Sequence, residues 1–200
     1  MLVFGAGHVG RALVLALAPL PFAVTWADPA RLILAGEFEQ KSRVKLFKQE
    51  LVSTGRLYFA RPRRIRWQYL APDPSTMIVD GDKAVLAMPG APLQTFDLAR
   101  DATMRAVFDQ LSSWLGASSP ETLKQGYEVA AAGPADAPVL ILTPRPGGPV
   151  AKAFAKIELR FDKQLLLRTI LLREASGDEK EIRFTKLARN AKLPDDAFKP

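Results

Sequence analysis

The chain has 200 residues, of which 48% are hydrophobic and 24% charged, and its net charge is +7. This composition is typical of a globular protein with a sizeable core, and the length suffices for one large β domain or two small ones. The lack of cysteine excludes disulfides, a thiolate metal site and a cysteine nucleophile. With His8 as the only histidine, a His-based triad or metal site is not expected, and we predict no catalytic residue, metal or cofactor.

Residues 1–31 differ in character from the rest of the chain. A short apolar run leads into Gly5-Ala-Gly7-His8-Val-Gly10, a helical apolar stretch follows, and Asp28 comes about 20 residues after the glycines. This order is that of the dinucleotide-binding fingerprint, and Met1–Asp28 resembles the start of the nucleotide-binding domain of XdhC-family xanthine dehydrogenase accessory proteins. That resemblance implies a weak alternative function, an NAD(P)-binding accessory protein with its site at Gly5, Gly7, Gly10 and Asp28.

The surroundings of the glycines favour other interpretations. Nothing after Arg31 supplies the alternating strands and helices that a Rossmann half requires, so we favour a fused fragment whose helix, about residues 8–18, packs on a sheet. A signal-like segment is the second alternative, with residues 12–20 as its apolar core and Thr25-Trp26-Ala27 as a small-residue cleavage site. We therefore expect residues 1–31 to form a separate N-terminal segment and residues 32–200 to form the main domain.

From Leu32 onward the sequence predicts short strands. Residues 36–41 form the first, and two alternating stretches follow at 56–61 and 64–69, each with one apolar and one polar face. Such alternation is typical of an antiparallel sheet with one buried and one solvated side. Asp80-Gly81 predicts a hairpin turn between strands at 76–79 and 83–88, and residues 93–98 predict a further strand. Arg61 breaks the pattern because it shares the apolar face of Leu57 and Phe59.

Helical spacing replaces the alternation after residue 100. Apolar residues between Met104 and Leu115 recur at intervals of three and four, which predicts a helix over 101–115 capped by Asp101. A shorter helix is expected at 120–125, with Pro120 in its first turn. Strands are predicted again at 127–131, 139–143, 157–161, 165–174 and 181–187, with a loop or brief turn at 152–154.

The β-rich part resembles the LolA family of outer-membrane lipoprotein carriers. The resemblance rests on an ordered series of motifs: Gly36–Lys41, Ser53–Pro62, Ile65-Arg-Trp67, Pro72-Asp-Pro-Ser, Asp80-Gly81 and the closing Leu193–Pro200. It covers about residues 32–200 and implies a mainly β (α+β) fold, an incomplete, strongly curved antiparallel β-barrel whose hydrophobic hollow is covered by helices. The implied protein is no enzyme but a monomeric periplasmic carrier that shields lipid chains from water.

The resemblance also implies site residues and partners. Arg61, the arginine before Pro62, corresponds to the family's inward-pointing residue that holds a helical lid. The candidate walls of a lipid-binding cavity are apolar residues on the predicted sheet and helix: Leu57, Phe59, Ile65, Trp67, Tyr69, Met77, Val79, Phe108 and Leu111. Acylated lipoproteins or lipids are the implied cargo, released by an inner-membrane complex and passed to an outer-membrane acceptor.

The positive charge leaves one further alternative. Arg61, Arg63, Arg64 and Arg66 beside Tyr58 and Trp67 are a pattern that single-stranded nucleic acids can bind. The basic residues are nevertheless spread through the strands, where they keep the polar face soluble, and we expect no nucleic-acid partner.

Overall fold

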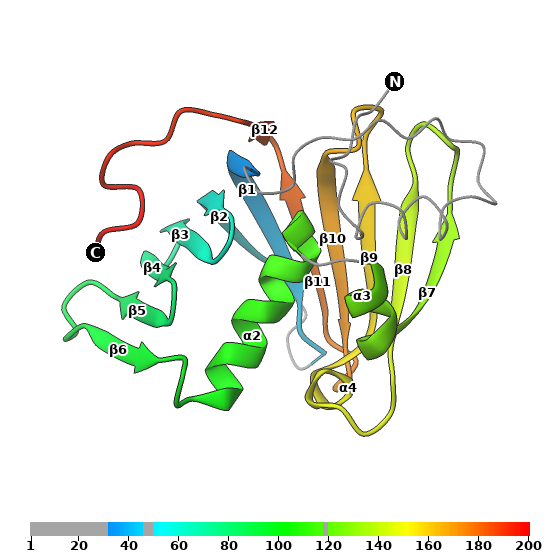
Figure 1. The fold of residues 1–200 in the computed structure, drawn as a ribbon, viewed down its shortest axis with the longest axis horizontal. Coiled ribbons are helices and arrows are strands. Elements are labelled where there is room, and N and C mark those ends of the chain that lie inside the picture. Colours follow the sequence, from blue (N-terminus) through cyan, green and yellow to red (C-terminus); the bar gives the residue numbers. More distant parts are fainter. Residues whose placement is uncertain (1–31, 46–49, 118–119) are drawn as a thin grey trace. The chain divides into compact units, whose positions relative to one another are not determined.

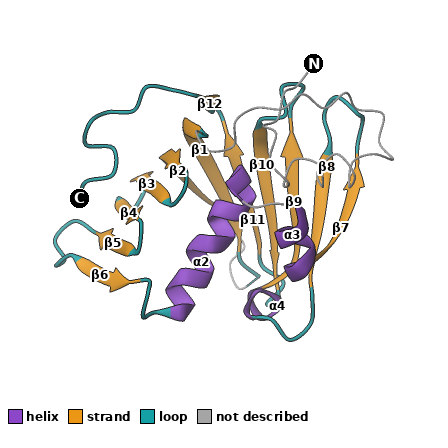
Figure 2. Cartoon of the chain, in the orientation of Figure 1, coloured by secondary structure: helices purple, strands orange, loops and turns teal. Residues whose placement is uncertain are grey.

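The structure of the chain, a computed structural model, describes residues 32–45, 50–117 and 120–200 (Figure 1). Its twelve strands form one antiparallel sheet in the order β6-β5-β4-β3-β2-β1-β11-β10-β9-β8-β7, with β12 paired to β1. Because β6 and β7 are the two ends of this order, the sheet is not closed into a barrel, and the mainly β prediction is confirmed (Figure 2). The glycine motif and the expected helix at 8–18 lie outside the described residues.

Two compact units make up the described chain. The β1–β6 unit comprises residues 30–41, 51–117 and 184–200. Its elements are β1 (Ile33–Arg43, up to residue 41), β2 (Leu51–Ala60), β3 (Arg64–Ala71), β4 (Ser75–Asp80), β5 (Lys83–Ala87), β6 (Gln94–Asp97), α2 (Ala102–Ser112), the π-helical turn η2 (Ser113–Ala117) and β12 (Ala188–Arg189).

The β7–β11 unit contains residues 42–50 and 118–183. Its elements are α3 (Pro120–Gly126), β7 (Tyr127–Ala132), β8 (Val139–Pro144), α4 (Pro149–Ala153), β9 (Phe154–Phe161), β10 (Leu167–Glu174) and β11 (Glu179–Phe184, up to residue 183). Neighbouring strands from β7 to β11 pair antiparallel in the order of the sequence, as expected for a meander.

The register of β2, β3 and β4 confirms the alternation predicted from the sequence. In the register, Trp67 pairs with Leu57 of β2 on one side and with Met77 of β4 on the other, and Ile65 pairs with Phe59 of β2. Successive side chains of a strand point to opposite faces, so all five lie on one side of the sheet. The hairpin at Asp80-Gly81 is also confirmed, since Asp80 pairs with Lys83 and Gly81 has a φ of 61°.

Some element boundaries differ from the predictions. Asp101 caps α2 as expected, its carboxylate accepting a hydrogen bond of 2.9 Å from the N–H of Met104, but the α-helix ends at Ser112 and continues as η2. The turn expected at 152–154 is a short helix ending at Ala153, and β11 ends at Phe184 instead of 187.

Asp162 explains why β10 begins at Leu167 and not at residue 165. Its carboxylate accepts hydrogen bonds of 2.9 Å from the N–H groups of Gln164 and Leu166, and it lies 2.6 Å from Nε of Arg168. These bonds form a tight turn in which Leu165 has a φ of 53°. Burial alone would raise the pKa of Asp162, but these donors lower it below its ordinary value.

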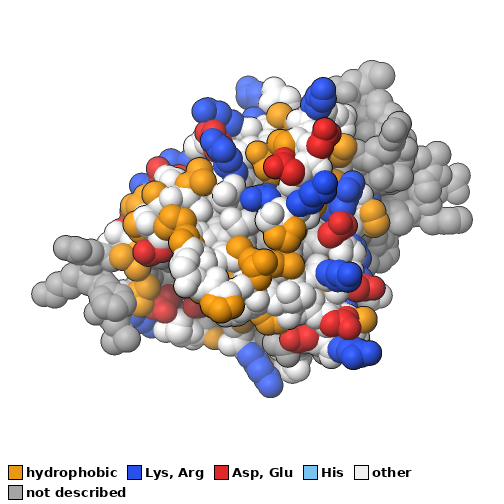
Figure 3. All heavy atoms as spheres, turned by 90° about the vertical axis from the view of Figure 1, so that its left-hand side faces the viewer, with side chains coloured by type: hydrophobic (Ala, Val, Ile, Leu, Met, Phe, Trp, Pro, Cys, Tyr) orange, Lys and Arg blue, Asp and Glu red, His pale blue; other side chains and the backbone are white. Residues whose placement is uncertain are grey.

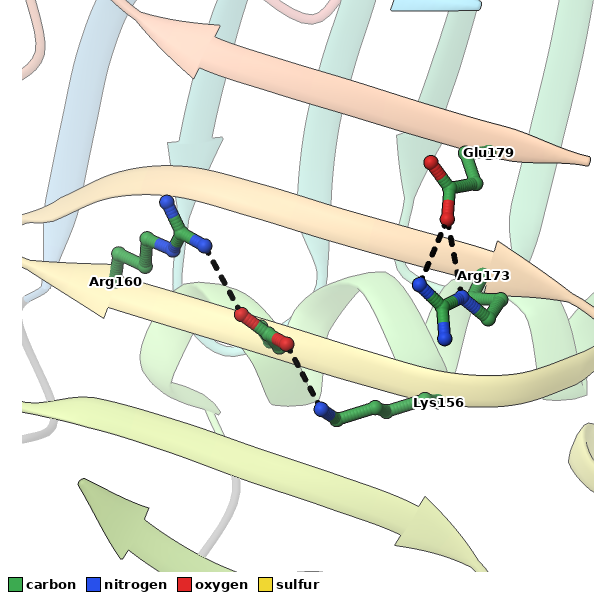
Figure 4. Close-up of polar contacts among 5 residues, drawn as sticks. Lys156, Arg160, Arg173 and Glu179 are labelled. Carbon is green, nitrogen blue, oxygen red and sulfur yellow. Dashed lines mark hydrogen bonds and ion pairs between the residues drawn. The ribbon is translucent and has the colours of Figure 1, made fainter. Parts of the chain in front are cut away.

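The polar face of β9, β10 and β11 carries ion pairs of alternating sign (Figure 4). Glu158 lies between Lys156 and Arg160, at 2.9 and 3.1 Å, and Arg173 contacts Glu179 at 2.8 Å. The hydrogen bond from Lys156, together with Arg160, lowers the pKa of Glu158. Charges of both signs therefore neutralise one another on this face, which suits contact with water.

Candidate functional site

The apolar face of the β1–β6 unit brings together most of the predicted wall residues. Leu57 and Phe59 have no exposed surface, and Trp67 is only 4% exposed. The nine predicted residues fall into two groups: Leu57, Phe59, Ile65, Trp67, Val79 and Phe108 are buried, whereas Tyr69, Met77 and Leu111 are half-buried. This face is therefore continuous and apolar, and its centre is covered by the protein itself.

An aromatic cluster forms the centre of this face. Phe38 of β1 lies 4.7 Å from Trp67 and 5.4 Å from Tyr69, measured between ring centroids, and Phe184 lies 6.3 Å from Trp67. Offset and edge-to-face arrangements at these distances are favourable for aromatic pairs. Gly55 of β2 makes room for the ring of Phe38, because a Cβ at this position would overlap with it. The cluster thus depends on a missing side chain in the neighbouring strand.

Few polar groups lie on this face. The hydroxyl of Tyr69 donates a hydrogen bond of 2.9 Å to Oε1 of Gln40. The indole Nε1 of Trp67 is buried, and no acceptor for its N–H is found in the part of the chain that the structure describes. The face therefore carries one donor whose hydrogen bond is not made.

Helix α2 and the turn η2 supply further buried side chains to this unit. Phe108 of α2, together with Trp114 and Leu115 of η2, is buried, and Figure 1 shows α2 beside the strands of its unit. Arg63, in the turn between β2 and β3, joins the helix to the sheet through Asp109 at 3.4 Å and also contacts Asp82 at 3.1 Å. All three side chains are substantially exposed, and such pairs contribute only about 0.2–1 kcal/mol each. The helix is therefore held by apolar packing and a weak polar link.

Arg61 lies one residue beyond the strand in which it was predicted. β2 ends at Ala60, and Arg61 begins the turn, where its N–H donates a hydrogen bond of 3.0 Å to the carbonyl of Leu32 and its bond to Pro62 is cis. The side chain is half-buried, and burial lowers the pKa of its guanidinium. Its role as a latch for a lid stays a prediction.

The closing residues Phe198 and Lys199 contact the opposite face of β3. The guanidinium of Arg64 lies 4.8 Å from the ring centroid of Phe198, and Arg66 donates a hydrogen bond of 2.7 Å to the carbonyl of Lys199. Ile78, which pairs with Arg66 on this face, is only 3% exposed. With Arg63 bound to Asp82 and Asp109, three of the four arginines in the nucleic-acid alternative are thus engaged by the chain itself. On the face drawn in Figure 3, basic and acidic side chains of the described residues are interspersed.

The sequence did not predict which residues contact Trp67 and α2. Phe38 and Gln40 belong to the strand predicted at 36–41, but the sequence does not indicate that this strand brings them to Trp67 and Tyr69. Phe184 is more than a hundred residues from Trp67 in sequence, and no local pattern joins them. The contact of Arg63 with Asp109 has a usable signal, an acidic residue on the polar side of an amphipathic helix.

Within the described residues, no helix is long and apolar enough to cross a membrane. The fold thus defines a class of proteins with an open antiparallel sheet, one face of which is apolar, buried and covered by a helix. The family model for the outer membrane lipoprotein carrier protein LolA matches residues 32–200, so the chain belongs to the LolA family. This confirms the family resemblance derived from the sequence.

One curated relative and two solved structures extend the comparison. The outer-membrane lipoprotein carrier protein of Dechloromonas aromatica (strain RCB) is 29% identical over 166 residues, which are 83% of this chain and 76% of that protein. The complex structure of Pseudomonas aeruginosa MucA/MucB matches with a TM-score of 0.54 and 17% identity over 86% of this chain. A crystal structure of MucB matches with 0.51 and 18% over the same share. The chain spans 56% and 58% of these two structures' chains, and the likeness concerns the fold.

Proposed function

We propose that the protein is a periplasmic carrier that binds the acyl chains of lipoproteins or related envelope lipids on the apolar face of its β1–β6 unit. The observation that carries the proposal is the continuous apolar face formed by Leu57, Phe59, Ile65, Trp67 and Val79, which a helix covers. Membership of the LolA family and the relative from Dechloromonas aromatica support it. Carriage of this kind needs no catalytic step.

Acyl chains and the helix compete for the same surface in this proposal. Each buried CH2 group stabilises the bound chain by about 0.8 kcal/mol, so a single chain of ordinary length can replace the contacts of several side chains. The centre of the face is buried, so cargo must displace side chains that now cover it, among them those of α2. The ion pair between Arg63 and Asp109 is weak enough to break during this step. We assign to Arg61 the role of the latch that holds the covering helix.

The proposed cargo route follows the family. The protein takes acylated lipoproteins or lipids from an inner-membrane release complex and delivers them toward an outer-membrane acceptor, as a monomer that binds no nucleic acid. Residues 32–200 act as the carrier, since the family model matches all of them.

A fluorescent fatty-acid probe tests the proposal, using the wild-type chain and two charged variants. Met77→Glu places a carboxylate on the apolar face and is expected to lower probe affinity at least tenfold, because burying an unpaired charge is strongly unfavourable. Leu70→Glu is the matched control, since Leu70 is 41% exposed and alternates with Tyr69 onto the other face of β3. Circular dichroism checks that both variants fold. A wild-type protein that binds no probe would refute the proposal.

A further inference from the structure

The buried N–H of Trp67 is the one feature of the apolar face that acyl chains alone do not explain. Its indole is 4% exposed, and its Nε1 has no acceptor within the described residues. A buried donor without a partner loses its hydrogen bond to water and receives nothing in exchange. Phenylalanine would fill an apolar site without this cost, so the indole calls for a reason beyond packing.

The neighbours of Trp67 supply no oxygen atom. Phe38 and Phe184 contact the indole with their rings, and Leu57 and Met77 flank it in the strand register. Every one of these side chains is apolar. Because no described residue accepts this N–H, its acceptor would come from outside the described part of the chain.

Tyr69, two residues along β3, offers an internal comparison. Its side chain lies on the same face as Trp67, and its hydroxyl donates to Oε1 of Gln40 at 2.9 Å. The fold thus supplies an acceptor for the hydroxyl of Tyr69 and none for the indole of Trp67. The face carries one satisfied polar group and, beside it, one donor that is available to a ligand.

We propose that Nε1 of Trp67 donates a hydrogen bond to a carbonyl oxygen of the cargo, in the ester or amide group that joins an acyl chain to its headgroup. This inference rests on the proposed function and names the chemistry that the apolar face recognises. Acyl chains fill the face through their CH2 groups, and the indole fixes how deep the carbonyl lies. Trp67 is then a specificity-determining residue that separates ester- and amide-linked chains from plain hydrocarbon and ether-linked chains.

A pair of lysophospholipids tests this hydrogen bond directly. The two probes are 1-myristoyl and 1-O-tetradecyl lysophosphatidylcholine, which share the headgroup and differ in the carbonyl, titrated below their micelle-forming concentrations. The wild-type protein is expected to bind the ester about tenfold more tightly, which corresponds to about 1.4 kcal/mol. Trp67→Phe should abolish this preference and leave the affinity for the ether within about twofold. Leu70→Ala, on the other face of β3, is the control and should keep the preference.

Two results would overturn the inference: equal affinity of the wild type for both lipids, or an ester preference that persists in Trp67→Phe. A second variant guards against misfolding, with Trp67 replaced by benzothienylalanine, which keeps the bicyclic shape and lacks the N–H. It is expected to behave like Trp67→Phe, and retention of the preference would again refute the hydrogen bond. If the wild type binds neither lipid, the proposed function fails, whereas equal binding refutes only the role of Trp67.

Discussion

Replacing Gly55 by alanine is expected to destabilise the β1–β6 unit and to disturb the aromatic cluster. An added Cβ would overlap with the carbonyl oxygen of Gln68 and with Cζ of Phe38, and would lie 2.7 Å from Cε1 of the same ring. Carbon atoms in contact are normally about 3.5–4.0 Å apart, so both the ring and the neighbouring strand must shift.

The expected cost follows from two opposing effects. Overpacking of a well-packed site costs about 1–3 kcal/mol, and here one of the two obstacles is backbone, which yields less easily than a ring. Alanine also restricts the unfolded chain, which offsets about 0.4–1 kcal/mol. We therefore expect Gly55→Ala to lower the free energy of unfolding by about 2 kcal/mol.

Urea denaturation followed by tryptophan fluorescence measures this loss, because Trp67 and Trp114 both belong to the β1–β6 unit. Gly126→Ala is the control, since a Cβ there meets nothing within 4 Å, and circular dichroism should show that it unfolds no earlier than the wild type. Phe38→Leu should cost less in the Gly55→Ala background than alone, because the added methyl group occupies part of the vacated space. An unchanged midpoint for Gly55→Ala would refute the close packing of Phe38 against β2.

Three other changes test contacts elsewhere in the chain. Asp162→Asn should lower the free energy of unfolding by about 2 kcal/mol at pH 7. The pKa of Asp162 is lower in the folded protein than in the unfolded chain. The stabilisation by this carboxylate is therefore present above the unfolded-chain pKa of about 4 and is lost as the pH falls through the folded-state pKa. Urea midpoints at pH 7 and pH 3 check this, and an equal cost at both would contradict it. A double-mutant cycle of Arg63→Ala and Asp109→Ala should give a coupling of about 0.2–1 kcal/mol that decreases at 1 M salt, and a coupling indifferent to salt would argue against the ion pair. Phe198→Ala should cost about 1 kcal/mol through the lost contact with Arg64, and a thermal melt equal to that of the wild type would count against it.

The strands of the apolar face could be predicted because their pattern is local. The alternation in 56–61 and 64–69, with the turn signal at Asp80-Gly81, is sufficient to place Leu57, Trp67 and Met77 on one face. The helix cap at Asp101 could be predicted for the same reason, since its carboxylate accepts a hydrogen bond from the N–H of Met104, three residues away. Short-range geometry of this kind depends on residues that are neighbours in the sequence.

Contacts between distant segments could not be predicted in the same way. Phe38, Trp67 and Phe184 meet because β1, β3 and the end of β11 are brought together by the whole sheet. Arg61 shows the related problem at a strand end, where alternation predicts the face of a residue but not the point at which the strand stops. The pairing of Arg66 with the carbonyl of Lys199 has no sequence signal, because any backbone oxygen could accept this bond.

The division of the β1–β6 unit along the chain has a consequence for its synthesis. Its parts are residues 30–41, 51–117 and 184–200, and the continuous stretch 118–183 between them belongs to the other unit. A ribosome makes about 5–20 residues per second, so β2 to β6 wait several seconds before Phe184 and the segment that holds Phe198 emerge. During that interval Trp67 lacks one of its aromatic neighbours, and Arg64 and Arg66 lack their partners in the closing segment. A holding chaperone that binds apolar strands would therefore act most usefully on this nascent intermediate.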